Sequence, residues 1–255
     1  MLKFTLDFNL ERGYNLIVKS YAQYCPIAAA LDVIGERWSL LIIRELSVGS
    51  RRFSDIRKAL PGLSPNLLVE RLKDLEASDV ISRNQNELTS SRCTYSLTEK
   101  GSELLPMLQF LSNWGEQFMP TDDANTQVSP VSAIRATLLN GINYKFLPPE
   151  GIRISLIIDG MKFKMYARGP VPILKSGLDP KADVHLKISA QDLVKWRQGR
   201  LLIADALANG RIYLKGTKVD QFLMVFSFVH PDFKPITPRP NPSSDRTSKT
   251  VALKS

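Results

Sequence analysis

The sequence predicts an α+β protein with two folded units. The first half combines short amphipathic helical patterns with two strand-like runs, whereas the second half alternates strand and helix patterns. A polar stretch ending at a proline separates the two, as linkers commonly do. The expected organisation is an N-terminal extension (1–19), a first domain (20–120), a linker (121–130), a second domain (131–230) and a disordered tail (231–255).

The first domain is organised around residues 60–78. Pro61 and Gly62 predict a tight turn, Ser64 is a good helix N-cap, and Pro65 suits the first helical position. Three leucines at helical spacing form one face of the predicted helix: Leu68, Leu72 and Leu75. At about 100° per residue, the opposite face carries Asn66, Val69, Glu70 and Lys73. We expect the leucines to dock on a core and the polar face to be available.

A polar helix face is usually only a solvated surface, so the neighbouring segments decide its interpretation. Residues 53–60 predict a second short helix directly before the turn. The two helices and the turn between them make a helix-turn-helix. Residues 80–83 and 94–97 predict two strands joined by a polar hairpin tip. A helix-turn-helix followed by such a hairpin is a winged helix, in which the second helix enters the major groove of DNA.

The net charge of +9 does not by itself identify a DNA reader. Residues 1–120 hold 14 basic and 14 acidic side chains, whereas residues 121–230 hold 15 and 9. Local clusters still favour phosphate contacts at the turn and at the hairpin tip. These clusters contain Arg51, Arg52, Arg57 and Lys58 before the turn, and Arg83 and Arg92 beside the tip.

Composition argues against several other classes. No apolar run approaches the roughly 18 residues that span a bilayer, and Asp7, Glu11 and Arg12 interrupt any signal-peptide pattern. We therefore expect a cytoplasmic protein without membrane insertion. Two cysteines and two histidines predict neither a disulfide scaffold nor a metal site. The sequence offers no nucleophile with a nearby base and no phosphate loop, so we expect neither enzymatic activity nor a cofactor.

The remaining patterns of the first domain predict which helices form its core and that it pairs with a second copy of the chain. Residues 26–34 and 38–46 predict helices, the second with Trp38, Leu41, Ile42 and Leu46 as its buried set. Thr98 opens a long apolar helix towards Phe118, which Pro106 should kink or restart. So apolar a helix needs a surface to bury against, and a second copy of the chain would supply it in a symmetric dimer. Residues 2–10 alternate like a strand.

Six ordered blocks of the first domain resemble those of HxlR-type transcriptional regulators, relatives of the MarR group. The blocks are residues 24–27, 31–38, 52–56, 60–64, 71–76 and 95–101. The resemblance covers about residues 20–120 and implies a dimeric winged-helix regulator that binds double-stranded DNA. It also implies that Cys25 matches an N-terminal cysteine which senses oxidants in some members. A helix N-terminus can make a thiol reactive, although buried inert cysteines are commoner.

The sequence of the second domain predicts a β-sheet together with several helices. Residues 152–158 and 161–167 predict strands around an Asp159-Gly160 turn, and residues 184–188 and 211–215 predict two more. Helices are expected over residues 131–139, from Ser189, over 205–208, and from Thr217 through an almost wholly apolar segment.

This order resembles sterol-carrier-protein-like domains, through residues 182–184, 196–199, 206–210 and 214–216. The resemblance implies a tunnel for an apolar or lipid-like small molecule, with Phe222, Leu223 and Phe226 among its lining residues. A solid core used for dimer packing is the alternative interpretation.

The predicted function is a dimeric, DNA-binding transcriptional regulator that responds to an apolar molecule or to thiol chemistry at Cys25. Base edges would be read by Asn66, Val69, Glu70 and Lys73. Phosphates and the backbone would be contacted by Arg51, Arg52, Ser64, Pro65, Ser91 and Arg92. The alternative is a lipid carrier whose winged helix binds proteins.

Overall fold

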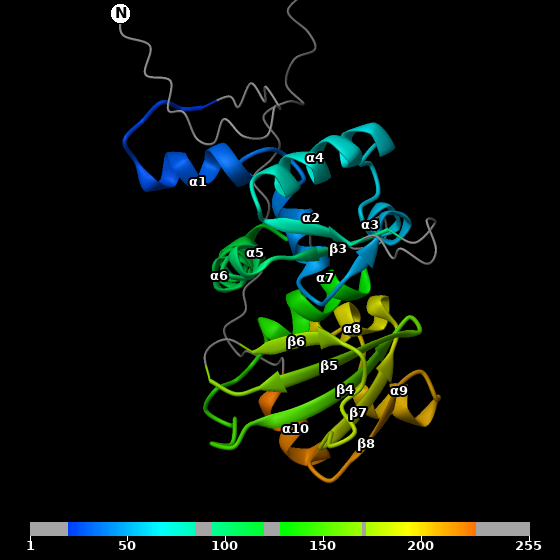
Figure 1. Ribbon diagram of the computed structural model, residues 1–255. Helices are drawn as coiled ribbons and strands as arrows, with labels where there is room; N and C mark the ends of the chain where they lie inside the picture. Colours follow the sequence, from blue (N-terminus) through cyan, green and yellow to red (C-terminus); the bar gives the residue numbers. More distant parts are fainter. Residues whose placement is uncertain (1–19, 85–92, 120–127, 170–171, 228–255) are drawn as a thin grey trace, which may run out of the picture.

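A computed structural model describes residues 20–84, 93–119, 128–169 and 172–227 (Figure 1). The predicted strand in residues 2–10, the hairpin tip with Ser91 and Arg92, and the tail from residue 231 lie outside this part. Within it, no helix is both long enough and apolar enough to cross a membrane.

The N-terminal unit is a winged helix-turn-helix. Its elements are α1 (Pro26–Ile34), α2 (Ser39–Leu46), β1 (Arg51–Arg52), α3 (Phe53–Ala59), α4 (Pro65–Ala77), β2 (Ile81–Asn84), β3 (Thr94–Leu97), α5 (Glu99–Ser102), α6 (Leu105–Gly115) and the 3-10 turn η1 (Glu116–Phe118). The strands form an antiparallel sheet in the order β1-β3-β2, with Ile81 opposite Leu97 and Arg51 opposite Tyr95.

Local sequence sets the helix ends of this unit. The Ser64 hydroxyl accepts a hydrogen bond from the Leu67 N–H at 3.3 Å, and that of Thr98 accepts one from the Gly101 N–H at 3.0 Å. The apolar segment after Thr98 is divided into α5 and α6 because Pro106 cannot continue the i to i−4 hydrogen bonds. The predicted restart at Pro106 is confirmed.

The core of the N-terminal unit gathers around α2 and α4. Its buried apolar side chains are Ile34, Ile42, Ile43, Leu46, Ile56, Leu60, Leu63, Leu68, Leu72, Leu75, Val80, Ile81 and Leu108. The predicted buried set of α2 is partly wrong, because Leu41 is exposed and Trp38 is only half-buried. Trp38 is the N-cap of α2, with a positive φ of 84°, and its half-buried side chain packs against this core.

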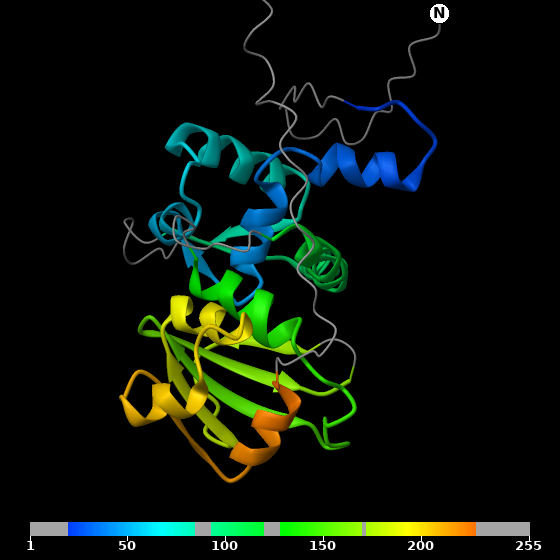
Figure 2. The ribbon, with the colours of Figure 1, turned by 180° about the vertical axis from the view of Figure 1, so that it is seen from behind.

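The C-terminal unit is a five-stranded sheet with helices on one face (Figure 2). Its elements are α7 (Pro130–Ile134), the π-helical turn η2 (Arg135–Leu139), β4 (Ile152–Ile158), β5 (Met161–Ala167), β6 (Ile173–Ser176), β7 (Val184–Ile188), α8 (Ala190–Arg197), α9 (Ile203–Ala208), β8 (Tyr213–Gly216) and α10 (Val219–Val225). The strand order is β6-β5-β4-β7-β8, and only the β4–β7 pair is parallel.

The strongest local patterns of this unit are confirmed. Strands β4 and β5 have the predicted bounds and meet in a hairpin, where Asp159 and Gly160 both adopt positive φ. The Ser189 hydroxyl caps α8 by accepting from the Asp192 N–H at 3.0 Å. Strand β6 was not predicted, because it is short and lies at the sheet edge, where only pairing with β5 defines it.

Inward-facing strand residues pack against the helices to form the second core. It includes Ile154, Leu156, Phe163, Met165, Leu186 and Phe222, all of which are buried. Val48 belongs to this core although it follows α2 in the N-terminal unit, and its carbonyl accepts a hydrogen bond from the Ser176 N–H at 2.6 Å. The two units therefore share an interface.

Gly101 provides a test of how closely α5 packs on β2. A Cβ added there would lie 1.9 Å from the Val80 carbonyl oxygen, which is backbone and cannot rotate away. We predict that Gly101→Ala lowers the free energy of unfolding by about 1–3 kcal/mol in urea titrations.

Gly115 in α6 is the matched control. No atom lies within 4 Å of the position of its added Cβ, so Gly115→Ala should leave stability unchanged or raise it by up to about 1 kcal/mol. Equal unfolding midpoints for Gly101→Ala and the parent chain would contradict the close packing.

Candidate nucleic-acid interface

The helix-turn-helix places α4 at the outside of the N-terminal unit (Figure 1). Helix α3 ends at Ala59, and the carbonyl of its C-cap residue Leu60 accepts a hydrogen bond from the Leu63 N–H at 3.2 Å across the turn. Gly62 has a φ of +85°, a conformation that glycine adopts without strain. Leu60 and Leu63 are buried, so the turn is anchored on both sides of Gly62.

The two faces of α4 differ as the leucine spacing predicts. Leu68, Leu72 and Leu75 are buried in the core. The opposite face is exposed along its length, with Asn66, Val69, Glu70 and Lys73 directed outward. Val69 is 42% exposed, so its methyl groups are available on this face. The outer face is therefore accessible and supported from behind by the three leucines.

Arg71 holds α4 from its side. Its guanidinium is largely buried among carboxylates. Nη2 lies 2.9 Å from Glu70 and 3.5 Å from Glu36, and Nη1 pairs with Asp74. Arg71 therefore orients Glu70 and ties α4 to the loop before α2.

The predicted phosphate ligands lie at the start of α3 and α4. Ser64 and Pro65 are exposed at the first turn of α4, and the hydroxyl of Ser64 still has its proton to donate because its oxygen is the helix cap. Arg52 is exposed, and its N–H donates to Asp55 Oδ2 at 3.4 Å. Arg57 and Lys58 are exposed on α3 as well.

Arg51 corrects one prediction. It was expected beside DNA, but its side chain is directed inward and only 8% of the residue is exposed. Its Nη2 lies 3.2 Å from Glu45 Oε2, and its Nε donates to the Glu45 carbonyl at 3.3 Å. Alternation along β1 is the reason, because successive residues of a strand point to opposite faces and Arg52 takes the outer one.

Two cysteines flank this surface. Cys25 is free, half-buried and directly precedes α1. Cys93 is also free, and the Nε of Arg83 donates to its Sγ at 3.0 Å at the base of the wing. That hydrogen bond raises the pKa of Arg83 above its ordinary value.

The sequence of residues 33–123 matches the HxlR-like helix-turn-helix family. The HTH-type transcriptional regulator YvaP of Bacillus subtilis is 42% identical over 99 residues, which are 38% of this chain and 92% of YvaP. The chain belongs to the HxlR-like family. YodB of Bacillus subtilis, also named an HTH-type transcriptional regulator, is 37% identical over 39% of this chain and 89% of YodB. An uncharacterized HTH-type transcriptional regulator from Methanothermobacter thermautotrophicus is 31% identical over 42% of this chain and 81% of its own length.

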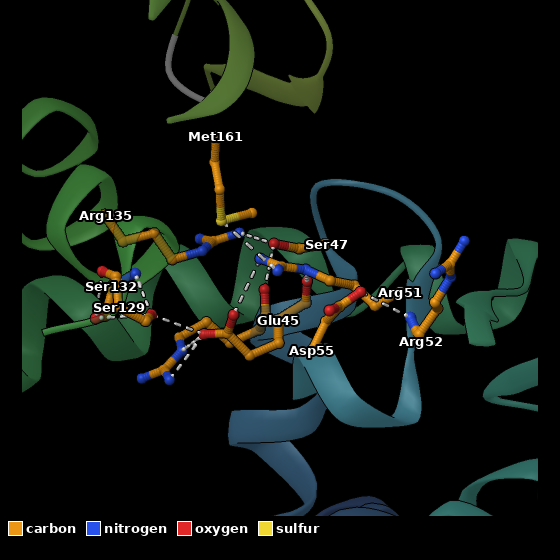
Figure 3. A network of polar contacts seen from close by, with 10 residues as sticks. Glu45, Ser47, Arg51, Arg52, Asp55, Ser129, Ser132, Arg135 and Met161 are labelled. Atoms are coloured by element: carbon orange, nitrogen blue, oxygen red, sulfur yellow. Dashed lines mark hydrogen bonds and ion pairs between the residues drawn. The ribbon is translucent and has the colours of Figure 1, made fainter. Parts of the chain in front are cut away.

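A buried polar network joins the HxlR-like segment to the C-terminal unit (Figure 3). Its centre is Glu45, a fully buried carboxylate near the end of α2. Oε1 lies 3.0 Å from Arg44 Nη2 and accepts a hydrogen bond from the Ser129 hydroxyl at 3.0 Å, while Oε2 pairs with Arg51. Ser129 is also the N-cap of α7, so one hydroxyl contacts both units.

Arg135 extends this network from η2. Its Nη2 donates to the Ser47 hydroxyl at 2.9 Å, and the residue is largely buried. Burial, reinforced by the nearby charge of Arg44, lowers the pKa of Arg135 to about 10. It is still protonated at neutral pH, so Glu45 faces the positive charges of Arg44, Arg51 and Arg135.

Glu45 has a role that the sequence patterns above do not predict. A helical pattern could have found it, because Glu45 lies three residues after Ile42 and therefore on the apolar face of α2. A charged residue on the apolar face of a helix indicates either that a partner of opposite charge is buried beside it or that this face is not buried. Its partners Arg51 and Ser129 lie in β1 and at the N-cap of α7, and only the fold brings them together.

The three predicted cavity residues are placed differently from one another. Phe222 and Phe226 are fully buried with ring centroids 4.7 Å apart, so they contribute to the second core. Leu223 lines an open hollow of about 440 Å³ with Phe146, Asp220, Met224 and Ser227. An enclosed tunnel remains a prediction of the sequence, and the hollow beside Leu223 is a surface feature.

We predict that Glu45→Gln destabilises the protein strongly. The amide cannot balance Arg51 and Arg135, whose charges would stay buried without their carboxylate. Breaking one side of such a pair costs about 3–5 kcal/mol, measurable as a lower urea midpoint. Glu70→Gln is the control, because the Glu70 side chain is 60% exposed and its loss should cost less than about 1 kcal/mol. Similar losses for the two variants would show that the network contributes little.

Proposed function

We propose that this protein is a dimeric, DNA-binding transcriptional regulator that inserts α4 into the major groove. The observation that carries the proposal is the outer face of α4, where four side chains are exposed while three leucines hold the helix from behind. Its relatives are named HTH-type transcriptional regulators, which supports the same function.

Each exposed side chain of α4 suits a base edge. Asn66 matches the donor and acceptor of adenine, and Lys73 matches the acceptors of guanine. Val69 can contact a thymine methyl group. Glu70 can accept from cytosine, and its ion pair with Arg71 keeps the carboxylate oriented while it does so. Arg52, Ser64 and Pro65 lie where the DNA backbone would pass, and Ser91 and Arg92 are proposed to contact it from the wing.

The proposed base contacts are tested with fragments of the DNA upstream of the protein's own gene, and the fragment that the parent chain binds most tightly is the preferred one. In salt-controlled gel shifts, Asn66→Ala and Lys73→Ala should each weaken binding to the preferred fragment by about 5- to 150-fold and relax its sequence preference. Arg52→Ala should weaken binding to all fragments alike and reduce the salt dependence by about one counterion, because it contacts only phosphate.

Lys145→Ala is the control, since Lys145 lies in the C-terminal unit and beside Phe146. It should bind like the parent chain. A parent chain that retards the preferred fragment no better than unrelated DNA would overturn the proposal and favour a lipid carrier whose winged helix binds proteins.

A homodimer would bury the apolar surface of α1 and α6. These helices lie towards the same side of the N-terminal unit (Figures 1 and 2). Ile27 and Phe110 are each 71% exposed and Trp114 is 61% exposed. The Trp114 ring packs on Phe118 with centroids 4.8 Å apart. Large aromatic side chains of this kind dominate protein interfaces, so the surface fits a second copy related by two-fold symmetry.

We expect the double variant Phe110→Glu/Trp114→Glu to weaken self-association at least about thirtyfold in sedimentation equilibrium. DNA affinity should fall with it, because one winged helix contacts only one half-site. Leu207→Glu on α9 is the control, an exposed leucine away from α1 and α6. A parent chain that stays monomeric at high concentration would contradict the dimer.

Two inputs to the regulator belong to the proposal. An apolar small molecule would occupy the C-terminal unit near Leu223, where the open hollow already exposes Met224 and Phe146. A thiol reaction would occur at Cys25, which is free and precedes α1, so modification there would act on a helix of the proposed dimer surface. Either input regulates DNA binding only if it favours one dimer arrangement over another.

A further inference from the structure

One face of the five-stranded sheet has no helical cover (Figure 1), whereas α7 to α10 pack on the other (Figure 2). Alternation along the strands divides the side chains accordingly, with the buried ones on the helical side. The side chains on the uncovered face are Arg153, Ser155, Ile157, Lys162, Lys164, Tyr166, Ile173, Lys175, His185, Lys187, Tyr213 and Lys215.

This face is strongly basic. It carries five exposed lysines and no aspartate or glutamate among its strand residues: Lys162, Lys164, Lys175, Lys187 and Lys215. Within the part of the chain that the structure describes, none of the five lies within 4.0 Å of a carboxylate. They are spread over β5 to β8, so the charge extends across a sheet about 19 Å wide.

Two of these lysines lie directly opposite one another, because Lys164 pairs in register with Lys175. Like charges in opposite positions of antiparallel strands repel, which destabilises the sheet. A negatively charged partner would remove this repulsion, and it would gain the attraction of the whole face.

A hollow of about 500 Å³ lies among the lysines. It is lined by Ser155, Ile157, Leu178, His185, Leu186, Lys187 and Tyr213. Tyr213 is 54% exposed, so its ring is accessible on one side. Leu178 forms the wall opposite β8, and its segment is held in place because the Asp179 N–H donates to the Ser155 hydroxyl at 2.9 Å. A ligand with a flat ring and an attached anionic group fits this arrangement, because the ring can enter the apolar and aromatic hollow while the anion contacts the lysines.

We propose that this uncovered sheet face binds single-stranded nucleic acid, with backbone phosphates on the lysines and a base in the hollow beside Tyr213. A basic surface that follows the backbone, together with aromatic rings on which bases stack, is the arrangement of proteins that bind single strands. The charge spans several phosphates, which exceeds what one small anion could occupy.

Duplex DNA and a membrane fit this face less well. The bases of a duplex are stacked inside it and cannot enter the hollow without being unpaired. An interfacial membrane surface needs a broad apolar area to insert, whereas lysines on β5, β6, β7 and β8 interrupt this face. Exposed Ile173 and Leu178 lie apart from one another, on β6 and on the segment before β7.

The test uses the full-length chain and fluorescein-labelled oligomers, about 20 nucleotides long, of uridine RNA and thymidine DNA in anisotropy titrations. The double variant Lys164→Glu/Lys187→Glu should weaken binding at least about tenfold and lower its salt dependence. Tyr213→Ala should weaken it about fivefold or more through lost stacking. The carboxylate introduced at position 164 would lie opposite Lys175, so the double variant should fold at least as stably as the parent, which thermal unfolding checks.

Lys145→Glu/Lys195→Glu is the control with the same charge change away from the face, and it should bind within about twofold of the parent. Asn66→Ala/Lys73→Ala should also bind these single strands normally, which separates this site from the proposed duplex reader on α4. Lysine-dependent binding to either strand supports the proposal, and the difference between the RNA and DNA arms identifies the preferred one.

Three results would overturn the proposal. The first is absence of binding to both strands, and the second is unchanged binding by the Lys164→Glu/Lys187→Glu variant. The third is lysine-dependent binding to phosphatidylserine vesicles without binding to either strand.

Discussion

A single buried carboxylate constrains how the two units of this chain meet. Glu45 is removed from water, and an ionised group in such a place is tolerated only with charged and hydrogen-bonding partners. Those partners come from both units: Arg44 and Arg51 lie in the N-terminal unit, and Ser129 is the N-cap of the first helix of the C-terminal unit (Figure 3). Separating the units would break the hydrogen bond from Ser129 to Glu45 and that from Arg135 to Ser47, so the interface favours one arrangement.

This arrangement connects the outer face of α4 to the second sheet through α2. Glu45 lies near the end of α2, and the same helix contributes Ile42 and Ile43 to the core that supports Leu68 and Leu72. Directly after α2, Val48 enters the core of the C-terminal unit. A change in that unit could thus reach α4 through one short helix. Coupling would require two arrangements of comparable stability, and the Glu45 network is the contact in which they would differ.

The distribution of charge follows the division into units. The N-terminal unit has no excess of basic residues, and its DNA-reading proposal rests on the geometry of α4 and on a few local cations. The excess between residues 121 and 230 has a definite location, because five of its lysines share the uncovered sheet face. One chain therefore presents two candidate surfaces for nucleic acid, a helix suited to a groove and a sheet suited to a single strand.

Local patterns in the sequence were sufficient to predict those elements whose conformation depends only on residues close by in the chain. The leucine spacing of α4, the caps at Ser64, Thr98 and Ser189, and the Asp159-Gly160 hairpin act over a few residues, so reading the sequence predicted them. Tertiary structure decided the burial of Arg51, the role of Glu45, the exposure of Ile27 and the existence of β6. Each of these depends on which distant segment lies alongside, and periodicity within a segment carries no information about that partner.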